Sequence, residues 1–185
     1  MLNKSPKRIV IIGSAGVGKT TLLNNLKKKI DLKTIPETAR EICNQSGYKS
    51  IYEIKDPDKF RFLVLNEQIK FEEKYKEFLS DRSTIDCWVH WVRWSWNIKR
   101  TFESENYFKL AYAQALKYSD IIYIPRMFKS KDDGFRWSDE DYQRQVDRLF
   151  REILLEWELT KRTFIVESKN LKDRVKEVMK YLKSY

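Results

Sequence analysis

The stretch GSAGVGKT, from Gly13 to Thr20, decides the fold of this chain. It fits the pattern G-x-x-x-x-G-K-[ST], follows the apolar run Ile9–Ile12, and is followed directly by a helical pattern. Its glycines allow a tight turn that points consecutive backbone N–H groups inward at a helix N-terminus. Chance would place the four fixed residues of the pattern in under about 1% of chains of this length. The stretch therefore predicts a loop that binds a polyphosphate.

The loop also predicts which groups meet a nucleotide. Lys19 would neutralise the β- and γ-phosphates, and the Thr20 hydroxyl would ligate Mg²⁺. The expected cofactors are therefore ATP, with GTP as an alternative, and Mg²⁺. The residues expected to bind the nucleotide are Gly13, Ser14, Ala15, Gly16, Val17, Gly18, Lys19, Thr20 and Thr21.

Five short runs of β-branched or aromatic residues, each bounded by turn-forming residues, predict buried strands. They are Arg8–Ile12, Lys33–Ile35, Glu77–Ser80, Asp120–Ile124 and Thr163–Val166. Between them, apolar residues recur at helical spacing. Strands that alternate with helices require crossover connections and a parallel sheet covered on both faces. The predicted fold class is α/β, a three-layer α/β/α P-loop NTPase fold with a five-stranded parallel sheet and a short lid.

Length and composition predict one domain. The chain has 185 residues, of which 42% are hydrophobic and 35% charged, enough for one core. We expect a single domain over residues 1–185, with the lid at approximately 126–137. The segment Arg126–Trp137 groups charged residues around Gly134, which is typical of a mobile loop. The helix after it has an N-cap signal at Ser138.

Several classes of protein are excluded by what the sequence lacks. Its apolar runs are far shorter than the roughly 20 residues that cross a bilayer, so no membrane insertion is expected. The run behind the basic N-terminal residues ends at once in the glycine-rich loop, which does not suit a secretory leader. With only Cys43, Cys87 and one histidine, neither a disulfide framework nor a zinc cluster can form. We therefore expect a cytoplasmic protein.

The net charge of +10 favours anionic partners. The lysines, however, are spread over helical segments, where charge usually marks a solvated face. The expected partners are a nucleotide and a small-molecule acceptor, nucleic acid is disfavoured, and a homodimer stays open.

Two predicted strands end in a carboxylate and an arginine. The second is followed by Pro36-Glu37-Thr38-Ala39-Arg40, and the third by Asp81-Arg82-Ser83. Ligands of open parallel sheets bind beyond the carboxyl ends of the strands. A carboxylate there can accept a proton from an attacking hydroxyl or hold Mg²⁺, while arginine can clamp an anionic substrate. The alternative for each pair is a helix-capping group with a nearby ion pair.

The order of four motifs resembles a known family. Gly13–Thr20, Pro36–Arg40, Asp81–Ser83 and Asp133–Arg136 together are similar to the AAA-domain-like P-loop kinase group that includes the nicotinamide riboside kinase domain. Deoxynucleoside and thymidylate kinases are more distantly similar. The resemblance spans about Arg8 to Leu182. It implies a kinase that uses ATP and Mg²⁺ to phosphorylate a hydroxyl of a nucleoside-like acceptor: a nucleoside, nicotinamide riboside or a nucleotide.

The resemblance also implies roles for individual residues. Glu37 would be the general base, Asp81 a Mg²⁺-associated carboxylate or the alternative base, and Arg82 a clamp on substrate or phosphate. Arg40 would help to close the acceptor site, and Arg136 would act from the lid on the transferred phosphoryl group. The catalytic set is thus Lys19, Glu37, Asp81 and Arg136, with Thr20 and Asp81 at the metal. The arginines close enough in sequence to share the work of Arg136 are Arg126, Arg144 and Arg148.

A tryptophan-rich segment, Asp86–Trp96, follows the third strand-end motif. Trp88, Trp91 and Trp94 would lie along one side of a helix, where an indole could stack on the ring of an acceptor. We assign Trp88 and Asp86 to acceptor binding. Packing of the indoles in the core is the alternative, and a structural role is expected for His90.

The alternative function is a nucleotide-dependent binding switch, either an ATPase or a GTPase, that docks a protein, lipid or nucleic-acid partner. A guanine-reading segment is absent after the fifth strand, which ends in Val166–Asn170. This absence weakens the GTPase alternative.

Overall fold

The computed structural model describes residues 6–95, 102–127 and 139–183. Its five strands are β1 (Arg8–Ile12), β2 (Lys33–Ile35), β3 (Phe78–Asp81), β4 (Asp120–Tyr123) and β5 (Thr163–Ile165). All pair in parallel, in the order β2-β3-β1-β4-β5. The five predicted strands are confirmed: β3 lies one residue later than predicted, and β4 and β5 end one residue earlier.

The register brings the predicted motifs to one edge. In β1, Ile11 pairs with Asp81 of β3, and Ile12 pairs with Tyr123 of β4. The loop that begins at Gly13 therefore leaves the sheet between the carboxyl ends of β3 and β4. This edge is where ligands of open parallel sheets bind.

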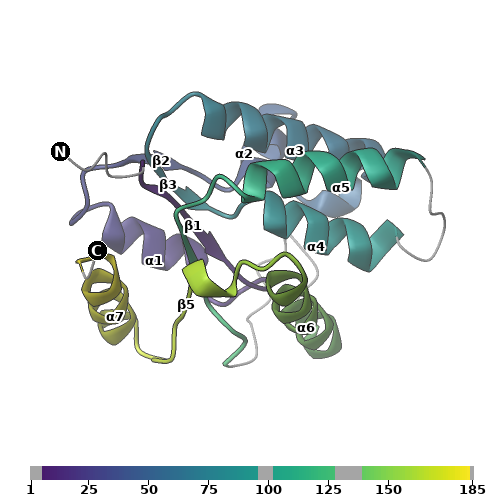
Figure 1. Ribbon diagram of the computed structural model, residues 1–185. Coiled ribbons are helices and arrows are strands. Elements are labelled where there is room, and N and C mark those ends of the chain that lie inside the picture. The colour runs from purple at the N-terminus through teal and green to yellow at the C-terminus, as the bar shows by residue number, and fades with distance from the viewer. Residues whose placement is uncertain (1–5, 96–101, 128–138, 184–185) are drawn as a thin grey trace.

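Seven helices lie within the described residues. Figure 1 shows how they are arranged around the sheet. They are α1 (Lys19–Leu26), α2 (Thr38–Gln45), α3 (Pro57–Glu73), α4 (Thr84–Ser95), α5 (Phe102–Ala115), α6 (Glu140–Glu156) and α7 (Leu171–Lys183). Short 3₁₀ turns occur at Ile51–Glu53 and Thr160–Arg162. The N-cap of α6 is Asp139, whose carboxylate accepts from the Tyr142 N–H, one residue after the predicted cap at Ser138.

The core has one apolar cluster on each face of the sheet because successive strand residues point to opposite faces. Val10 and Ile12 of β1 pack with α3, α4, α5 and α6, whereas Ile9 and Ile11 pack with α1 and α7. Both faces are thus covered, which explains why the central strands β1 and β4 are nearly continuous apolar runs. The predicted three-layer α/β/α fold is confirmed (Figure 1).

Two predictions fall largely outside this description. The lid expected at 126–137 is described only for its first two residues, and Trp96 lies outside the described ranges. No helix among the described residues is both long enough and apolar enough to span a bilayer.

Candidate functional site

Three glycines shape the loop between β1 and α1. Gly13, Gly16 and Gly18 have φ values of 143°, 74° and 97°, a region that other residues rarely adopt. A Cβ on Gly13 would also lie 2.4 Å from the carbonyl oxygen of Ile124. These glycines are therefore required by the backbone path of the loop.

The carbonyl groups of the loop are held by side chains. Lys19 Nζ donates to the carbonyl oxygens of Gly13 and Ser14, at 2.8 and 2.7 Å. Gln143 of α6 donates to the Ala15 carbonyl at 2.7 Å, and Arg174 of α7 donates to the Val17 carbonyl at 2.7 Å.

The N–H groups of the loop are left for a ligand. Those of Ala15, Gly16 and Gly18 donate to no acceptor within the described ranges. The Ser14 hydroxyl is buried and also has no partner there. A ring of N–H groups at a helix N-terminus is an anion-binding arrangement.

Thr20 and Asp81 meet across this loop. The Thr20 hydroxyl donates to Asp81 Oδ2, and Asp81 Oδ1 is buried without a hydrogen-bond partner among the described residues. One hydroxyl and one carboxylate beside a phosphate loop fit Mg²⁺, which prefers oxygen ligands and usually takes only one or two carboxylates from the protein. No group of three or more His, Cys, Asp or Glu side chains suited to a metal occurs within the described ranges.

Arg82 joins the two strand-end motifs. Its Nε donates to Glu37 Oε1 at 2.7 Å, and its Nη1 donates to Asp86 Oδ1 at 3.1 Å. Its φ is 80°, unusual for a side-chain-bearing residue and typical of a strained position at a functional site. Arg40 Nε lies 3.6 Å from Glu37 Oε2, so both arginines of the motifs contact the same carboxylate.

Burial and charge act in opposite directions on these groups. Burial alone would lower the pKa of Arg82, but the carboxylates of Glu37, Asp86 and Asp81 outweigh it and raise the pKa. Burial raises the pKa of Asp86 to about 6, against the opposing effect of Arg82 and Lys19. Arg82 therefore stays cationic at neutral pH.

Two cavities meet at Glu37. One, of about 190 Å³, is lined by Gly16, Gly18, Lys19, Thr20, Thr21 and Glu37. The other, of about 170 Å³, lies beyond Glu37 and is mostly apolar. Glu37 is 7% exposed and lines both. A carboxylate at this junction lies between a phosphate site and a second compartment.

The second cavity has a polar end and an apolar wall. Its polar end comprises Glu37, Arg82, Asp86 and His90. Its wall includes Ile51, Ile54, Pro57, Phe60, Val64 and Trp94. His90 of α4 lies between Tyr142 and Arg82. Its Nδ1 lies 3.1 Å from the hydroxyl of Tyr142 in α6, and its Nε2 lies 3.4 Å from Arg82 Nη1.

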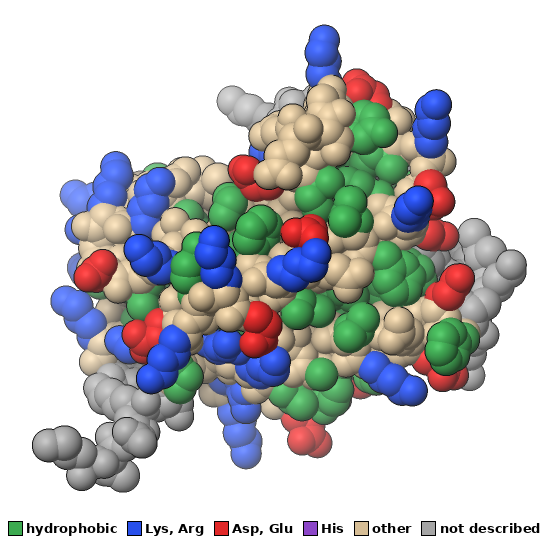
Figure 2. All heavy atoms as spheres, turned by 90° about the horizontal axis from the view of Figure 1, so that it is seen from above, with side chains coloured by type: hydrophobic (Ala, Val, Ile, Leu, Met, Phe, Trp, Pro, Cys, Tyr) green, Lys and Arg blue, Asp and Glu red, His purple; other side chains and the backbone are tan. Residues whose placement is uncertain are grey.

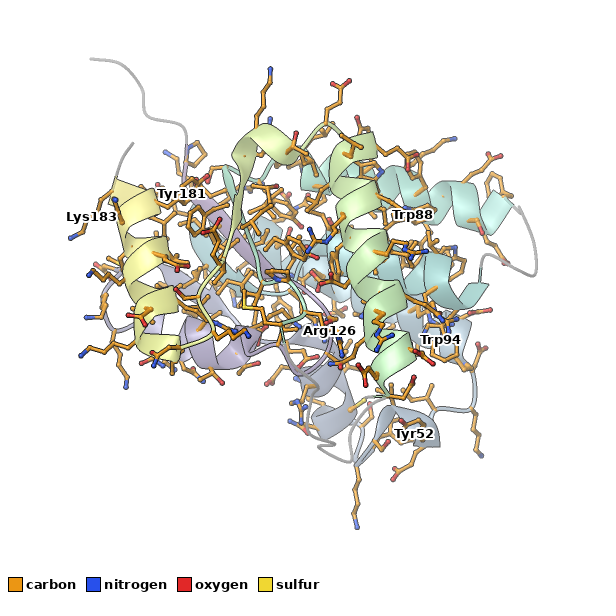
Figure 3. All side chains as sticks on the ribbon, turned by 90° about the horizontal axis from the view of Figure 1, so that it is seen from below. Tyr52, Trp88, Trp94, Arg126, Tyr181 and Lys183 are labelled. Carbon is orange, nitrogen blue, oxygen red and sulfur yellow. The ribbon has the colours of Figure 1, made fainter. Side chains whose placement is uncertain are left out.

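Trp88 does not line the second cavity, where an acceptor-binding residue would have to lie. It is buried in the aromatic core, with its ring 6.4 Å from that of Trp157 and 5.2 Å from that of Phe108. Trp94 lines the cavity instead, and in Figure 3 it lies toward Tyr52, away from Trp88. Trp88, near the start of α4, is covered by α5 and α6, whereas Trp94 lies near the end of the helix.

The arginines near the predicted lid differ in their contacts. Arg126 Nη2 and Arg144 Nη2 both contact Glu140 Oε1 at 2.6 Å, and Arg148 is exposed on α6. Arg136 lies outside the described residues, so its assignment stays a prediction.

A buried polar network lies behind the strand ends. Glu72 of α3 is fully buried and accepts hydrogen bonds from Gln68, Gln114 and Tyr118 at 2.8 to 3.0 Å. Burial raises the pKa of Glu72 to about 7, although these hydrogen bonds oppose the rise. The network reaches Thr38 within the first strand-end motif, and Ser80 and Thr84, which flank the second.

Sequence reasoning missed the residues that hold the loop and those that form the apolar wall of the second cavity. Gln143 and Arg174 contact residues 128 and 157 positions away. Neither residue belongs to a motif of the sequence. The placement of Trp94 was implied by the tryptophan spacing, but that spacing did not distinguish it from Trp88.

Comparison with known proteins assigns a family. Residues 8–174 match the model of a family described as an AAA domain. The chain belongs to this AAA domain family. The match covers the loop at Gly13–Thr20, both strand-end motifs and the start of α7. No curated protein shows significant similarity to the chain.

Solved structures share the fold of this AAA domain chain at low identity. NadR in complex with NR is 20% identical with a TM-score of 0.77, over 96% of this chain and 52% of NadR. Deoxyadenosine kinase from M. mycoides with bound dCTP is 20% identical with a TM-score of 0.69, over 96% and 99% of the two chains. Thymidylate kinase from Candida albicans is 14% identical with a TM-score of 0.67, over 97% and 92%.

These likenesses agree with the resemblance drawn from the four motifs. The fold is that of the P-loop kinase group, and the chain spans about half the length of NadR. The predicted membership of an AAA-domain-like group is confirmed by the family match over residues 8–174.

Proposed function

We propose that this protein is an ATP- and Mg²⁺-dependent kinase that phosphorylates a hydroxyl of a nucleoside-like acceptor. The observation that carries the proposal is the position of Glu37, a buried carboxylate shared by a phosphate-binding loop and an adjoining apolar cavity. A kinase must bring a donor phosphate and an acceptor hydroxyl together beside a group that accepts the proton. A nucleotide-dependent switch has no need for the second compartment.

The side chains then have distinct tasks. The N–H groups of the loop bind the phosphates, and Lys19 turns from the Gly13 and Ser14 carbonyls toward the β- and γ-phosphates. Glu37 accepts the proton of the acceptor hydroxyl, while Arg82 holds that carboxylate in place. Catalysis rests on positioning and on charge neutralisation, without a covalent intermediate.

The metal assignment uses Thr20 and Asp81. These two would hold Mg²⁺ through oxygen, and the unpartnered Asp81 Oδ1 supports this assignment. The chemistry that the ion supplies is charge neutralisation at the phosphate oxygens.

The charges of the second cavity favour an acceptor that carries no phosphate. Its two arginines already contact carboxylates: Arg82 contacts Glu37 and Asp86, and Arg61 Nη1 lies 2.5 Å from Asp58 Oδ1. The apolar wall with Phe60 and Trp94 suits an aromatic ring. A nucleoside or nicotinamide riboside therefore fits better than a nucleoside monophosphate.

A panel assay tests the proposal. The protein is incubated with ATP and Mg²⁺ and, in turn, ribonucleosides, deoxynucleosides, nicotinamide riboside and nucleoside monophosphates, and products are identified by mass. We expect a monophosphate product from at least one unphosphorylated acceptor and none from the Lys19→Ala variant. Hydrolysis of ATP without any phosphorylated acceptor would contradict the kinase and favour the switch.

A further inference from the structure

We propose that Arg174 and Gln143 are positioning residues that set the phosphate-binding loop in its ligand-binding shape. Neither belongs to the loop, to α1 or to the strand-end motifs. The inference rests on the proposed nucleotide site and adds two residues from opposite layers of the fold to it.

Arg174 lies in the first turn of α7 and is 3% exposed. Its Nη1 donates to the Val17 carbonyl and its Nε to the Ser168 carbonyl, both at 2.7 Å. A Cβ built on Gly18 would lie 3.2 Å from the same Nη1, so the guanidinium packs directly against the loop. One planar cation thus joins the loop to the segment that follows β5.

Gln143 approaches the loop from the other face of the sheet. It is fully buried in α6, and its Nε2 donates to the Ala15 carbonyl at 2.7 Å. Two alternate carbonyls of the loop, Ala15 and Val17, are therefore held by side chains from α6 and α7.

Holding the carbonyls fixes the direction of the N–H groups. A peptide unit is planar, so a carbonyl bonded outward turns the next N–H inward. The carbonyls of Ala15 and Val17 belong to the same peptide units as the N–H groups of Gly16 and Gly18, which lack a protein acceptor in the described ranges. The fixed charge of Arg174 also lies behind the loop, where it favours an anion.

The test measures equilibrium binding of inorganic tripolyphosphate and of AMP-PNP with Mg²⁺ by calorimetry. Arg174→Met and Gln143→Met are compared with Lys176→Met and Gln145→Met, exposed residues on the same two helices. We expect the two buried variants to weaken tripolyphosphate binding about 10-fold or more, as loss of hydrogen bonds at a charged site does, and the controls to leave it unchanged. The KM for the acceptor, measured at saturating nucleotide, should stay within about 2-fold in Arg174→Met, because no residue of α7 lines the second cavity.

The Arg174→Lys variant distinguishes an effect on the shape of the loop from a general loss of folding stability. Lysine keeps the charge but cannot form the fork, so we expect part of the lost affinity to return. If Arg174→Met fails to fold, Arg174→Lys and Gln143→Met decide the question. Affinities equal to those of the controls in all folded variants would overturn the proposal. Binding of tripolyphosphate is measured without an acceptor, so absence of kinase activity in the native protein would count against the proposed function only.

Discussion

Gly13 lies where the loop leaves β1, against the carbonyl oxygen of Ile124, the residue that follows β4. Its φ of 143° and the 2.4 Å approach of a built Cβ exclude any other residue without a shift of backbone. Arg82, in contrast, is a residue with a long side chain whose backbone has a positive φ of 80°. Its ion pairs with Glu37 and Asp86 hold it in that conformation.

Replacing Gly13 should therefore destabilise the protein more than replacing another glycine of positive φ. We expect Gly13→Ala to lower the free energy of unfolding by about 3 kcal/mol, from backbone strain and from the clash with Ile124. Gly47 is the matched control: its φ is 75°, but a Cβ would meet nothing within 4 Å. Gly47→Ala should lose only about 1 kcal/mol. Urea denaturation measures both values, and equal losses would contradict the close approach at Gly13.

Replacing each of the two strand-end carboxylates, Glu37 and Asp81, should impair activity in a different way. Glu37→Gln should lower kcat by about 100-fold or more, because a proton acceptor is lost, and added Mg²⁺ should not restore it. Asp81→Asn should be partly restored by Mg²⁺, since it weakens a metal ligand. Steady-state kinetics over a Mg²⁺ titration checks both variants. If Mg²⁺ restored the kcat of Glu37→Gln, Glu37 would be the metal ligand and Asp81 the general base.

Five elements meet at the buried network around Glu72. The carboxylate on α3 contacts Gln114 of α5 and, through Gln68, both Thr38 of α2 and Ser80 of β3. Tyr118 extends the network to the backbone of α4. A buried polar network of this kind fixes the relative positions of its members. Here it aligns the two strand ends that carry Glu37 and Asp81.

This network should make stability depend on pH. The pKa of Glu72 is raised from 4.5 to about 7, so the folded state keeps a proton that the unfolded chain releases. Its stabilisation is complete below about pH 4.5 and is lost as the pH rises through about 7. Asp86, with its pKa raised from 3.8 to about 6, adds a slope of the same sign at lower pH.

Glu72→Gln should flatten this slope between about pH 5 and 7, because the amide does not titrate. The absolute stability should also fall, since the new NH₂ group faces the amide donors of Gln68 or Gln114. Urea denaturation at several pH values gives the slope, with Glu67→Gln on the same helix as the control. A slope unchanged from the native protein would contradict the raised pKa of Glu72.

The whole molecule combines a basic surface with a site built at one edge of the sheet. The net charge is +10, and in Figure 2 Lys and Arg side chains gather on the left of the view. Hydrophobic side chains are exposed mainly on the right, and Leu63 of α3 and Leu110 of α5 are among the exposed hydrophobic residues. A positive surface raises the local concentration of anions such as nucleoside triphosphates.

Nucleotide binding should stabilise the entire fold, since the loop contacts both α6 and α7. At 100 times its Kd, AMP-PNP with Mg²⁺ should add about 2.7 kcal/mol to the free energy of unfolding. For a chain of this length, this corresponds to a rise in Tm of about 5–10 °C. Scanning calorimetry measures the rise, and Lys19→Ala should lose most of it. A native protein whose Tm does not respond to the nucleotide would contradict the phosphate site.

The sequence was sufficient for whatever is encoded locally. The strands, the loop and the strand-end pairs could all be predicted, because each depends on residues close together in the chain and on the rule that parallel strands end at one edge. Contacts between distant helices could not be predicted from one sequence. Gln143 and Arg174 contact the loop only because α6 and α7 pack against it in the folded protein. Trp88 is buried in the core and Trp94 lines the second cavity, and this difference depends on which helices pack against each side chain.

Two adjacent residues of α6 contribute to different parts of the candidate site. The Tyr142 ring lines the second cavity, while the Gln143 amide holds the Ala15 carbonyl of the loop. A small rotation or shift of this one helix therefore changes both compartments together. Donor and acceptor should consequently bind with mutual cooperativity, and thermodynamic reciprocity requires each to alter the affinity of the other by the same factor.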